Sequence, residues 1–482
     1  MKKTIALALA SVLALSMLAA CNINTANVRP DGSTAFMSYA GAVFPLSVLD
    51  DADGITASRN ITFDFSGFGE TRTNGNTRLH HSDIPITDSY ILTNKTADDK
   101  TVQLVYPFAG NFANIYKLIP NIAVDGNMIE TELAAGSYSG DFSGAGSREG
   151  MNLRFINSWE DYVALLSDGT YLKRALSDAP VLDQPVTVYR FSNARADHSK
   201  DPAATLAVRF SLDYDKTTVL TYGFNGGEFG RADGFQRRSF FVPNEINPWF
   251  GRNFYMIVIG EDIQNLTMQG YKNGGCRRGD EVDHVSADME RYEAVLGDVL
   301  LYLFNDFFNA PSGCFCEDCA NGFTTPAGHL NENIDIAMLY RAAVELLLDY
   351  GALSDSVIGR YDTGMLEDIF SEARGMDRVF YLTAEVEIPA GESVSIDVSF
   401  IKPGSFDFFF KGSRNIGLYG YDILTTLGSN LLFESTTATI VGSDRIEIVR
   451  QSFGFDLGNG VLSVALDAEK PHFFLEVRGA AN

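Results

Sequence analysis

Ser393-Val-Ser-Ile-Asp-Val-Ser-Phe400 alternates polar and apolar side chains without a break. Successive side chains of a β-strand point to opposite faces, so this stretch has one apolar and one polar face. The pattern predicts a half-buried strand of an antiparallel sheet. Just before it, Phe380-Tyr-Leu-Thr-Ala-Glu-Val-Glu-Ile388 predicts a second strand, and Pro389-Ala-Gly-Glu392 predicts the turn between the two. We therefore expect residues 376–482 to form a C-terminal β-sandwich-like domain.

A similar pair of strands is predicted near the other end of the chain. Ser89-Tyr-Ile-Leu-Thr93 and Thr101-Val-Gln-Leu-Val-Tyr-Pro107 flank the polar connection Asn94-Lys-Thr-Ala-Asp-Asp-Lys100. This arrangement predicts a β-hairpin. Ile61-Thr-Phe-Asp-Phe-Ser-Gly67 has the same alternating character and predicts another strand. We expect residues 34–150 to form an N-terminal antiparallel β-sandwich-like domain.

The middle of the chain combines a short helix with further strands. Ser158 is suited to cap a helix that begins at Trp159 and places Tyr162 and Leu166 on the same face. Four runs rich in β-branched and aromatic residues follow at 186–191, 205–212, 218–223 and 254–259. These runs predict strands. Residues 151–282 are therefore expected to form a mixed antiparallel sheet with a short helix.

Two later stretches have the apolar spacing of amphipathic helices. They span residues 288–308 and 333–350, and Gly351 stands where a C-cap glycine belongs. We predict that they pair as an antiparallel helical hairpin within a helical subdomain of residues 283–375. The predicted fold class is thus mainly β with an α insert (α+β). In it, two sandwich-like domains flank a mixed sheet and a helical hairpin.

Composition and charge limit the class of protein and its partners. The chain has 482 residues, of which 45% are hydrophobic and 21% charged, so it can bury substantial cores. Its formal net charge of −25 repels phosphate backbones, and we expect no nucleic-acid partner. No stretch after residue 21 approaches the roughly 20 apolar residues of a membrane-spanning helix. We expect this part of the chain to lie outside the bilayer.

The N-terminal residues form a secretory signal. Lys2 and Lys3 are followed by an apolar run that ends in Leu18-Ala19-Ala20-Cys21. This tetrapeptide resembles the lipobox of bacterial lipoprotein precursors. The resemblance implies that the signal peptide comprises residues 1–20 and that Cys21 becomes the acylated N-terminus of the mature protein. Residues 21–33 are then predicted to be a tether, and the protein is expected on the cell membrane or the outer envelope face.

Four further cysteines are the one group of residues that suggests a disulfide or metal site. Cys314-Phe-Cys-Glu-Asp-Cys319 is a C-x-C-x-x-C cluster, and Cys276 precedes it. Four cysteines can form two disulfides outside the cell, hold a structural zinc or iron ion, or remain free thiols. All three alternatives stay open. In each of the first two, Cys276, Cys314, Cys316 and Cys319 would stabilise the connection between the helices rather than catalyse a reaction.

No motif in the chain assigns a catalytic residue. There is no G-x-S-x-G, no Walker A loop and no H-E-x-x-H. His80 and His81 are neighbours, but adjacent side chains of a strand point apart, so we expect an exposed loop rather than a metal site. Glu261 and Asp262 end an apolar run and could face a cleft, yet acids are common at strand ends. The cofactor prediction is therefore limited to the cysteine cluster.

Two classes of function remain. We expect a lipid-anchored extracytoplasmic protein, bound to the membrane through acyl chains on Cys21, that acts as a non-enzymatic binding or envelope-assembly module with a protein partner in the envelope. The alternative is a lipid-anchored hydrolase that acts on envelope or extracellular polymer. A deep pocket with two close carboxylates would favour the alternative.

Overall fold

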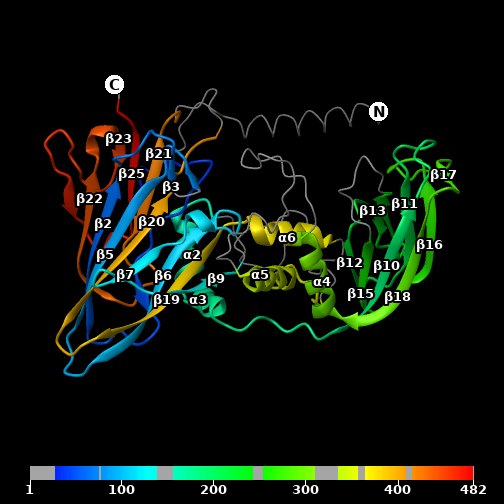
Figure 1. The fold of residues 1–482 in the computed structure, drawn as a ribbon, viewed down its shortest axis with the longest axis horizontal. Helices are drawn as coiled ribbons and strands as arrows, with labels where there is room; N and C mark the ends of the chain where they lie inside the picture. Colours follow the sequence, from blue (N-terminus) through cyan, green and yellow to red (C-terminus); the bar gives the residue numbers. More distant parts are fainter. Residues whose placement is uncertain are drawn as a thin grey trace.

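The computed structural model describes residues 28–74, 77–137, 156–242, 253–309, 335–355, 364–408 and 415–480. With 46% strand and 15% helix, the fold is mainly β, as the sequence predicted. Figure 1 shows two β-rich lobes with helices between them. We call them the N/C lobe, which contains segments from both halves of the chain, and the middle lobe, which contains residues 185–295.

The N/C lobe is built from three main sheets. The seven-stranded sheet has the order β24 (Ser463–Ala465), β22 (Leu432–Val441), β2 (Ile55–Asp64), β5 (Ile84–Asn94), β20 (Ser393–Lys402), β7 (Asn121–Val124) and β8 (Asn127–Met128). The β6/β19 sheet has the order β1 (Ser47–Val48), β6 (Lys100–Gly110), β19 (Arg378–Ile388) and β9 (Glu132–Ala135). The three-stranded sheet has the order β21 (Tyr419–Leu424), β25 (His472–Gly479) and β23 (Ile446–Gln451). A small ribbon of β3 (Arg72–Asn74) and β4 (Thr77–Leu79) projects from this lobe.

The seven-stranded sheet packs against the other two sheets at different positions along its strands. Tyr90 and Leu92 of β5 share a core with Leu104 of β6. Further along the sheet, Ile86 of β5 shares a second core with Leu475 of β25. Both cores use the alternating buried positions of β5, as the period-two pattern requires.

The predicted hairpins are wrong in their pairing. β5 and β6 are consecutive strands, but β5 pairs with β20 and β6 pairs with β19. The connections 95–99 and 389–392 therefore cross from one sheet to another. Alternation shows which face of a strand is buried, but two amphipathic strands can bury their faces across a core as well as side by side. Here the apolar faces of β5 and β6 meet across the core.

The predicted division into separate N- and C-terminal sandwich-like units does not describe how the strands pair. Besides the pairs above, β22 pairs in parallel with β2. Strands from residues 34–150 and from residues 376–482 thus share two sheets. The short helices α2 (Trp159–Leu166) and α3 (Thr170–Ala175) also belong to the N/C lobe, because Tyr162 and Tyr171 pack against Tyr381 in one cluster.

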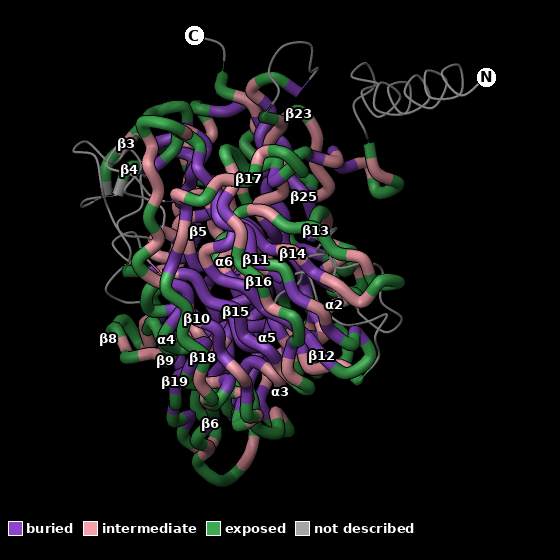
Figure 2. Tube along the Cα trace, turned by 90° about the vertical axis from the view of Figure 1, so that its right-hand side faces the viewer, coloured by how far each residue is buried: buried purple, intermediate pink, exposed green. Residues whose placement is uncertain are grey.

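The middle lobe consists of two packed sheets. The β10/β15 sheet has the order β12 (Thr217–Tyr222), β15 (Phe254–Gly260), β10 (Pro185–Arg195) and β18 (Ser286–Val295). The five-stranded sheet has the order β13 (Gly226–Gly230), β14 (Phe235–Phe241), β11 (Thr205–Ser211), β16 (Gln264–Tyr271) and β17 (Glu281–Val282). β12 and β15 are buried on both faces, because one face meets the five-stranded sheet and the other meets the helices. In Figure 2, which views the molecule from this side, exposed residues lie mainly in the outer strands and loops.

The predicted helix over residues 288–308 is wrong in its first third. Residues 286–295 form β18, which pairs along its length with β10, and α4 (Leu296–Asn309) begins only afterwards. Tyr292 and Ala294 are half-buried positions of this strand, at a spacing of two. Backbone pairing with β10 therefore overrides the helical spacing. Leu296 and Gly297 then donate backbone hydrogen bonds to Gln184 and Leu182, both at 2.9 Å, where the helix starts.

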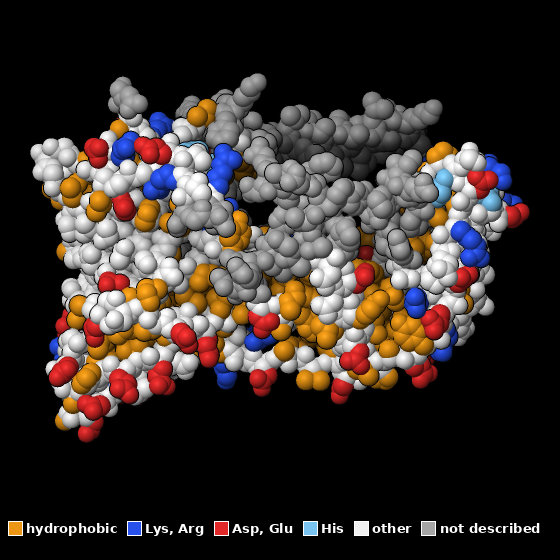
Figure 3. Space-filling view, in the orientation of Figure 1, with side chains coloured by type: hydrophobic (Ala, Val, Ile, Leu, Met, Phe, Trp, Pro, Cys, Tyr) orange, Lys and Arg blue, Asp and Glu red, His pale blue; other side chains and the backbone are white. Residues whose placement is uncertain are grey.

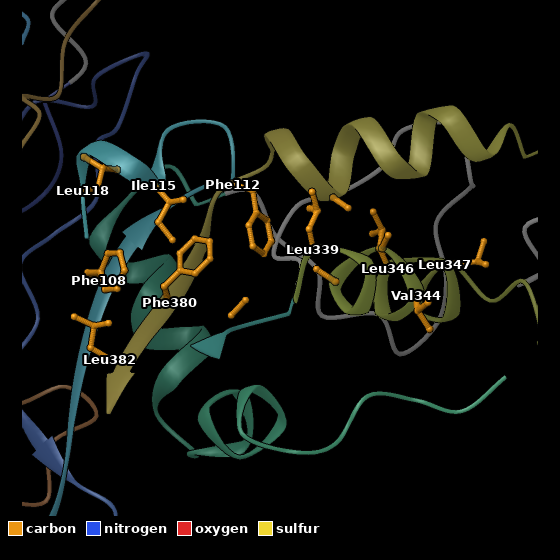
Figure 4. Close-up of a cluster of buried hydrophobic side chains, with 14 of the residues drawn as sticks. Phe108, Phe112, Ile115, Leu118, Leu339, Val344, Leu346, Leu347, Phe380 and Leu382 are labelled. Atoms are coloured by element: carbon orange, nitrogen blue, oxygen red, sulfur yellow. The ribbon is translucent and has the colours of Figure 1, made fainter. Parts of the chain in front are cut away.

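Helices α4, α5 (Ile336–Asp349) and α6 (Leu366–Gly375) form the layer between the lobes. Asp335 caps α5, with its side chain accepting from the Ala337 amide at 2.8 Å, and Gly351 has the positive φ of +74° that its predicted capping role requires. Figure 4 shows where Leu339 of α5 meets the aromatic side chains Phe112 and Phe380 of the N/C lobe. On the face drawn in Figure 3, hydrophobic side chains gather over this layer.

Candidate functional site

The first described residues cover the outer face of the three-stranded sheet. Val43 exchanges backbone hydrogen bonds with β21, donating to Asp422 and accepting from Leu424, both at 2.9 Å. Ser38 pairs in the same way with Phe406. We call residues 28–44 the docked segment. The predicted tether, 21–33, is therefore wrong for residues 28–33, because these residues are packed against the body.

Strand alternation explains which side chains meet the docked segment. Phe473, Leu475 and Val477 of β25 point into the core of the N/C lobe. His472, Phe474 and Glu476 consequently point to the opposite face, toward the docked segment. A Cβ atom at Gly420 of β21 would lie 2.4 Å from Cε2 of Phe36, so only glycine leaves room for this ring. The docked segment thus depends on Gly420 of β21 and faces His472, Phe474 and Glu476 of β25.

His472 lies at the centre of a buried polar network. Its Nε2 lies 3.1 Å from Asp422 Oδ2 and its Nδ1 lies 3.1 Å from Asp31 Oδ2. The Trp159 ring stacks on the imidazole with ring centroids 4.7 Å apart. Both ring nitrogens therefore face carboxylate oxygens, which are hydrogen-bond acceptors when ionised. The imidazole thus lies between a carboxylate of the docked segment and a carboxylate of the sheet, and it connects the two.

A second carboxylate binds the docked segment nearby. Glu476, whose side chain is 1% exposed, accepts from Arg450 Nε at 2.7 Å. It also accepts from the Thr34 hydroxyl at 2.8 Å and from the Thr34 amide at 2.5 Å. A buried carboxylate needs such partners, because burial without them is costly. Glu476 is thus a further point, besides the His472–Asp31 contact, at which the sheet holds the docked segment.

The pKa values around Asp422 reflect burial and charge. Burial and the nearby Asp422 carboxylate raise the pKa of Tyr39 well above its usual value, and its hydroxyl donates to Asp422 Oδ2 at 2.6 Å. Burial lowers the pKa of Lys402 to about 8, although Asp422 and Asp377 act in the opposite direction. Its ammonium group donates to the Ala40 carbonyl at 2.7 Å. β20 of the seven-stranded sheet therefore holds this buried lysine beside Asp422 and Asp377.

A cavity of about 240 Å³ opens beside the network. Its wall contains Tyr39 of the docked segment and Asp377, which precedes β19. The Asp377 carboxylate accepts from Asn111 Nδ2 at 2.8 Å, and burial raises the pKa of Asp377. The other described lining residues are Met37, Ser38, Asn111, Ile156, Asn157, Gly375, Met376 and Phe408. The lining thus combines apolar and polar side chains in similar number, and a donor or cationic group of a ligand would fit Asp377.

Most of the predicted cysteine site falls outside the described residues. This applies to Cys21, Cys314, Cys316 and Cys319, so lipidation, disulfides and a metal ion stay predictions. Cys276 is 3% exposed and forms no disulfide with another described residue. Burial raises the pKa of its thiol. Within the seven described ranges, no group of three or more His, Cys, Asp or Glu side chains is arranged to hold a metal ion.

The other residues singled out from the sequence have structural partners. The His80 and His81 rings lie with centroids 3.9 Å apart, because residues 80–83 form a turn rather than a strand. Glu261 pairs with Lys216 at 3.0 Å. Asp262 accepts from Arg291 at 2.7 Å, so neither acid is held free for catalysis.

No known family model matches the chain, and no curated protein is significantly similar to it in sequence. No helix in the described part of the chain is long and apolar enough to cross a membrane. Sequence reasoning missed His472, Asp422, Asp31 and the cavity. Asp31 and His472 are 441 residues apart, and no spacing rule connects them. The one available signal was the alternation of β25, which places His472 and Glu476 on the same face.

Proposed function

We propose that the protein is a lipid-anchored extracytoplasmic binding or envelope-assembly module, composed of sandwich-like β units and attached through acyl chains on Cys21. The observation that carries the proposal is the docked segment. Only six residues separate Cys21 from Val28, where the described chain begins. At 3.3–3.6 Å per residue, they would let the body lie at most about 25 Å from the anchor. The N/C lobe would therefore stay close to the membrane surface.

The cavity supports binding as the activity of this module. Its wall includes Met37, Ser38 and Tyr39 of the docked segment, so the segment that continues to the anchor also shapes the cavity. The network of Asp31, His472 and Asp422 fixes that segment. A ligand with a donor or cationic group would meet Asp377 there. We propose that the module acts near the membrane and binds such a ligand or a partner in the envelope.

Replacement of the acylated residue tests the anchor. We expect Cys21→Ser to abolish labelling with radioactive fatty acid and to move the protein from the detergent phase to the aqueous phase on phase partitioning. The folded body should be unchanged, because Cys21 precedes the docked segment. Cys276→Ser, which removes a cysteine of the body, is the matched control and should keep both the label and the detergent-phase position. An unchanged membrane fraction in Cys21→Ser would contradict the anchor.

Ligand binding and hydrolysis predict different results at Asp377. If the cavity only binds, Asp377→Asn should weaken the binding of a small organic amine. Neither the parent nor the variant should then release fragments from polymer. If the protein is instead the hydrolase, purified protein should release soluble fragments from isolated envelope polymer. Asp377→Asn should then abolish this release, and the binding proposal would be replaced.

The cysteine cluster is part of the proposal as a structural staple, formed by disulfides or by zinc or iron. Metal analysis of the purified full chain, with thiol titration before and after reduction, distinguishes the two. We expect either bound metal or fewer than four titratable thiols among Cys276, Cys314, Cys316 and Cys319. Because burial raises the pKa of the Cys276 thiol, the titration has to be made on unfolded protein. Four free thiols without metal would exclude both forms of the staple.

A further inference from the structure

A second surface of the N/C lobe has the features of a docking site. A groove of about 580 Å³ runs along β23 and the chain that follows it. Figure 1 places β23 at the upper margin of this lobe. The described residues that line the groove are Ile446, Glu447, Ile448, Gln451, Gly454, Phe455, Asp456 and Leu457.

β23 is an edge strand of the three-stranded sheet. It pairs with β25 on one side, and no other described strand pairs with it. An edge strand offers a row of backbone N–H and C=O groups that can pair with another chain. Proteins commonly protect such edges with charged residues or bulges, and β23 has one irregularity in register, between Ile448 and Arg450. The part before this irregularity is the regular stretch available for pairing.

The floor of the groove is apolar and follows the spacing of a strand. Ile446 and Phe455 are buried in the core between the three-stranded and seven-stranded sheets. Ile448 and Leu457 are partly buried against the same core. Ile446 and Ile448 are two residues apart and therefore lie on the same face of β23. An extended segment laid beside β23 would present every second side chain to this floor.

The rim of the groove is acidic. Glu447 is exposed, and hydrogen bonds from Asn459 lower the pKa of Asp456. The described lining contains no lysine or arginine. Opposite charges across an interface favour one partner over others. A second copy of this chain, with its net charge of −25, fits poorly, whereas a segment with lysine or arginine fits well.

We propose that this groove binds an extended basic segment of a partner protein, which pairs with β23 as an added strand. Apolar side chains of the segment would face Ile448 and Leu457, and alternate lysine or arginine side chains would face Glu447 and Asp456. Backbone pairing provides affinity in this mode of recognition, and the alternating pockets provide specificity. The site is separate from the cavity at Tyr39, and the proposal does not depend on acylation of Cys21.

Synthetic peptides test the proposal directly. The probe is an eight-residue peptide of alternating valine and lysine with blocked ends. One control alternates valine and glutamate, and the other is the lysine peptide with alternate backbone amides methylated, which removes donors needed for strand pairing. We expect binding of the first peptide alone, together with slower amide hydrogen exchange in residues 446–451. Equal binding of the methylated peptide, or protection elsewhere but not in β23, would overturn strand addition.

Two charge-reversal variants distinguish binding at this groove from attraction to the overall negative charge of the chain. Glu447→Lys should weaken binding of the lysine peptide by about fivefold or more. Glu385→Lys makes the same change in net charge on an exposed position of β19 and should change the affinity less than twofold. Equal losses in both variants would show that only overall charge is sensed, and would overturn the proposed groove. Circular dichroism of both variants verifies that they are folded.

Discussion

Gly420 shows how a single residue determines the contact between the docked segment and the sheet. It is the second residue of β21, and glycine is normally unfavourable within a strand because it weakens the strand. Its lack of a side chain lets the Phe36 ring lie directly on the backbone of the sheet. The Phe36 residue is 8% exposed as a result. Glycine is therefore needed here so that the Phe36 ring can approach the backbone, and not for an unusual backbone conformation.

Substitution of this glycine should loosen the docked segment. We expect Gly420→Ala to destabilise the protein by about 1–3 kcal/mol, because overpacking displaces Phe36. Limited proteolysis should then cut within residues 28–44 sooner than in the parent. Gly479→Ala is the matched control in β25, where an added Cβ would meet no atom within 4 Å. If combining Gly420→Ala with Phe36→Ala gives no relief, the clash with this ring is not the cause.

At the scale of elements, α6 is the helix that contacts both the middle lobe and α5. Thr221 of β12 donates to the Gly364 carbonyl at 3.0 Å, next to a parallel bridge between Thr221 and Met365. Glu367 accepts from the Gly223 amide at the end of β12 through Oε1. Its Oε2 is buried without a hydrogen-bond partner among the described residues. Burial raises the pKa of Glu367 to about 7.

This carboxyl should make stability depend on pH. The folded protein keeps the Glu367 proton up to about pH 7, whereas the unfolded chain releases it near 4.5. Stability should therefore fall as pH rises from about 4.5 to about 7, by up to about 3 kcal/mol. We expect Glu367→Gln to lose this decline in urea unfolding at pH 5 and pH 8. Glu385→Gln, at an exposed position, should follow the parent, and parallel curves for all three proteins would contradict the assignment.

Helices and strands were predicted best where residues close together in the sequence determine where the element begins and ends. Ser158 caps α2, accepting from the Asp161 amide at 3.4 Å, and α5 begins and ends within three residues of the predicted helix. The helical pattern predicted the wrong element for residues 286–295, because backbone pairing with β10 holds these residues in a strand. The strand pattern failed at β5 and β6, because an amphipathic strand does not reveal its neighbour. Alternation within β25 places His472 and Glu476 on one face, but no local pattern connects His472 with Asp31 or Asp422.

At the scale of the whole molecule, one hydrophobic core passes from the N/C lobe through the helix layer to the middle lobe. It includes Leu104 of β6, Leu346 of α5, Phe304 of α4 and Ile257 of β15. Phe304 lies near its middle and contacts Tyr340 and Phe370, with ring centroids 5.3 Å and 5.4 Å away. Because these contacts are shared, the helices couple the stability of the two lobes.

Truncation of Phe304 should therefore lower the stability of both lobes. We expect Phe304→Ala to cost about 3–5 kcal/mol and to speed amide hydrogen exchange in β12 and β15 as well as in α5. Phe63→Ala removes an equally buried ring from the separate core of the N/C lobe and is the matched control. It should leave exchange in β12 and β15 unchanged. Exchange confined to the helices in Phe304→Ala would show that the lobes are independent.

The sequence by itself determined the mainly β class, the faces of most strands and the caps of the helices, because these depend on side chains a few residues apart. Tertiary structure alone decided which strands pair, and it joined both halves of the chain in one lobe. Arg59 illustrates the difference: it occupies an inward position of β2, yet it is buried as the partner of Asp88 at 2.8 Å. Periodicity fixes where a side chain points, but its partner comes from any part of the chain that packing brings near, as with Asp31 and His472.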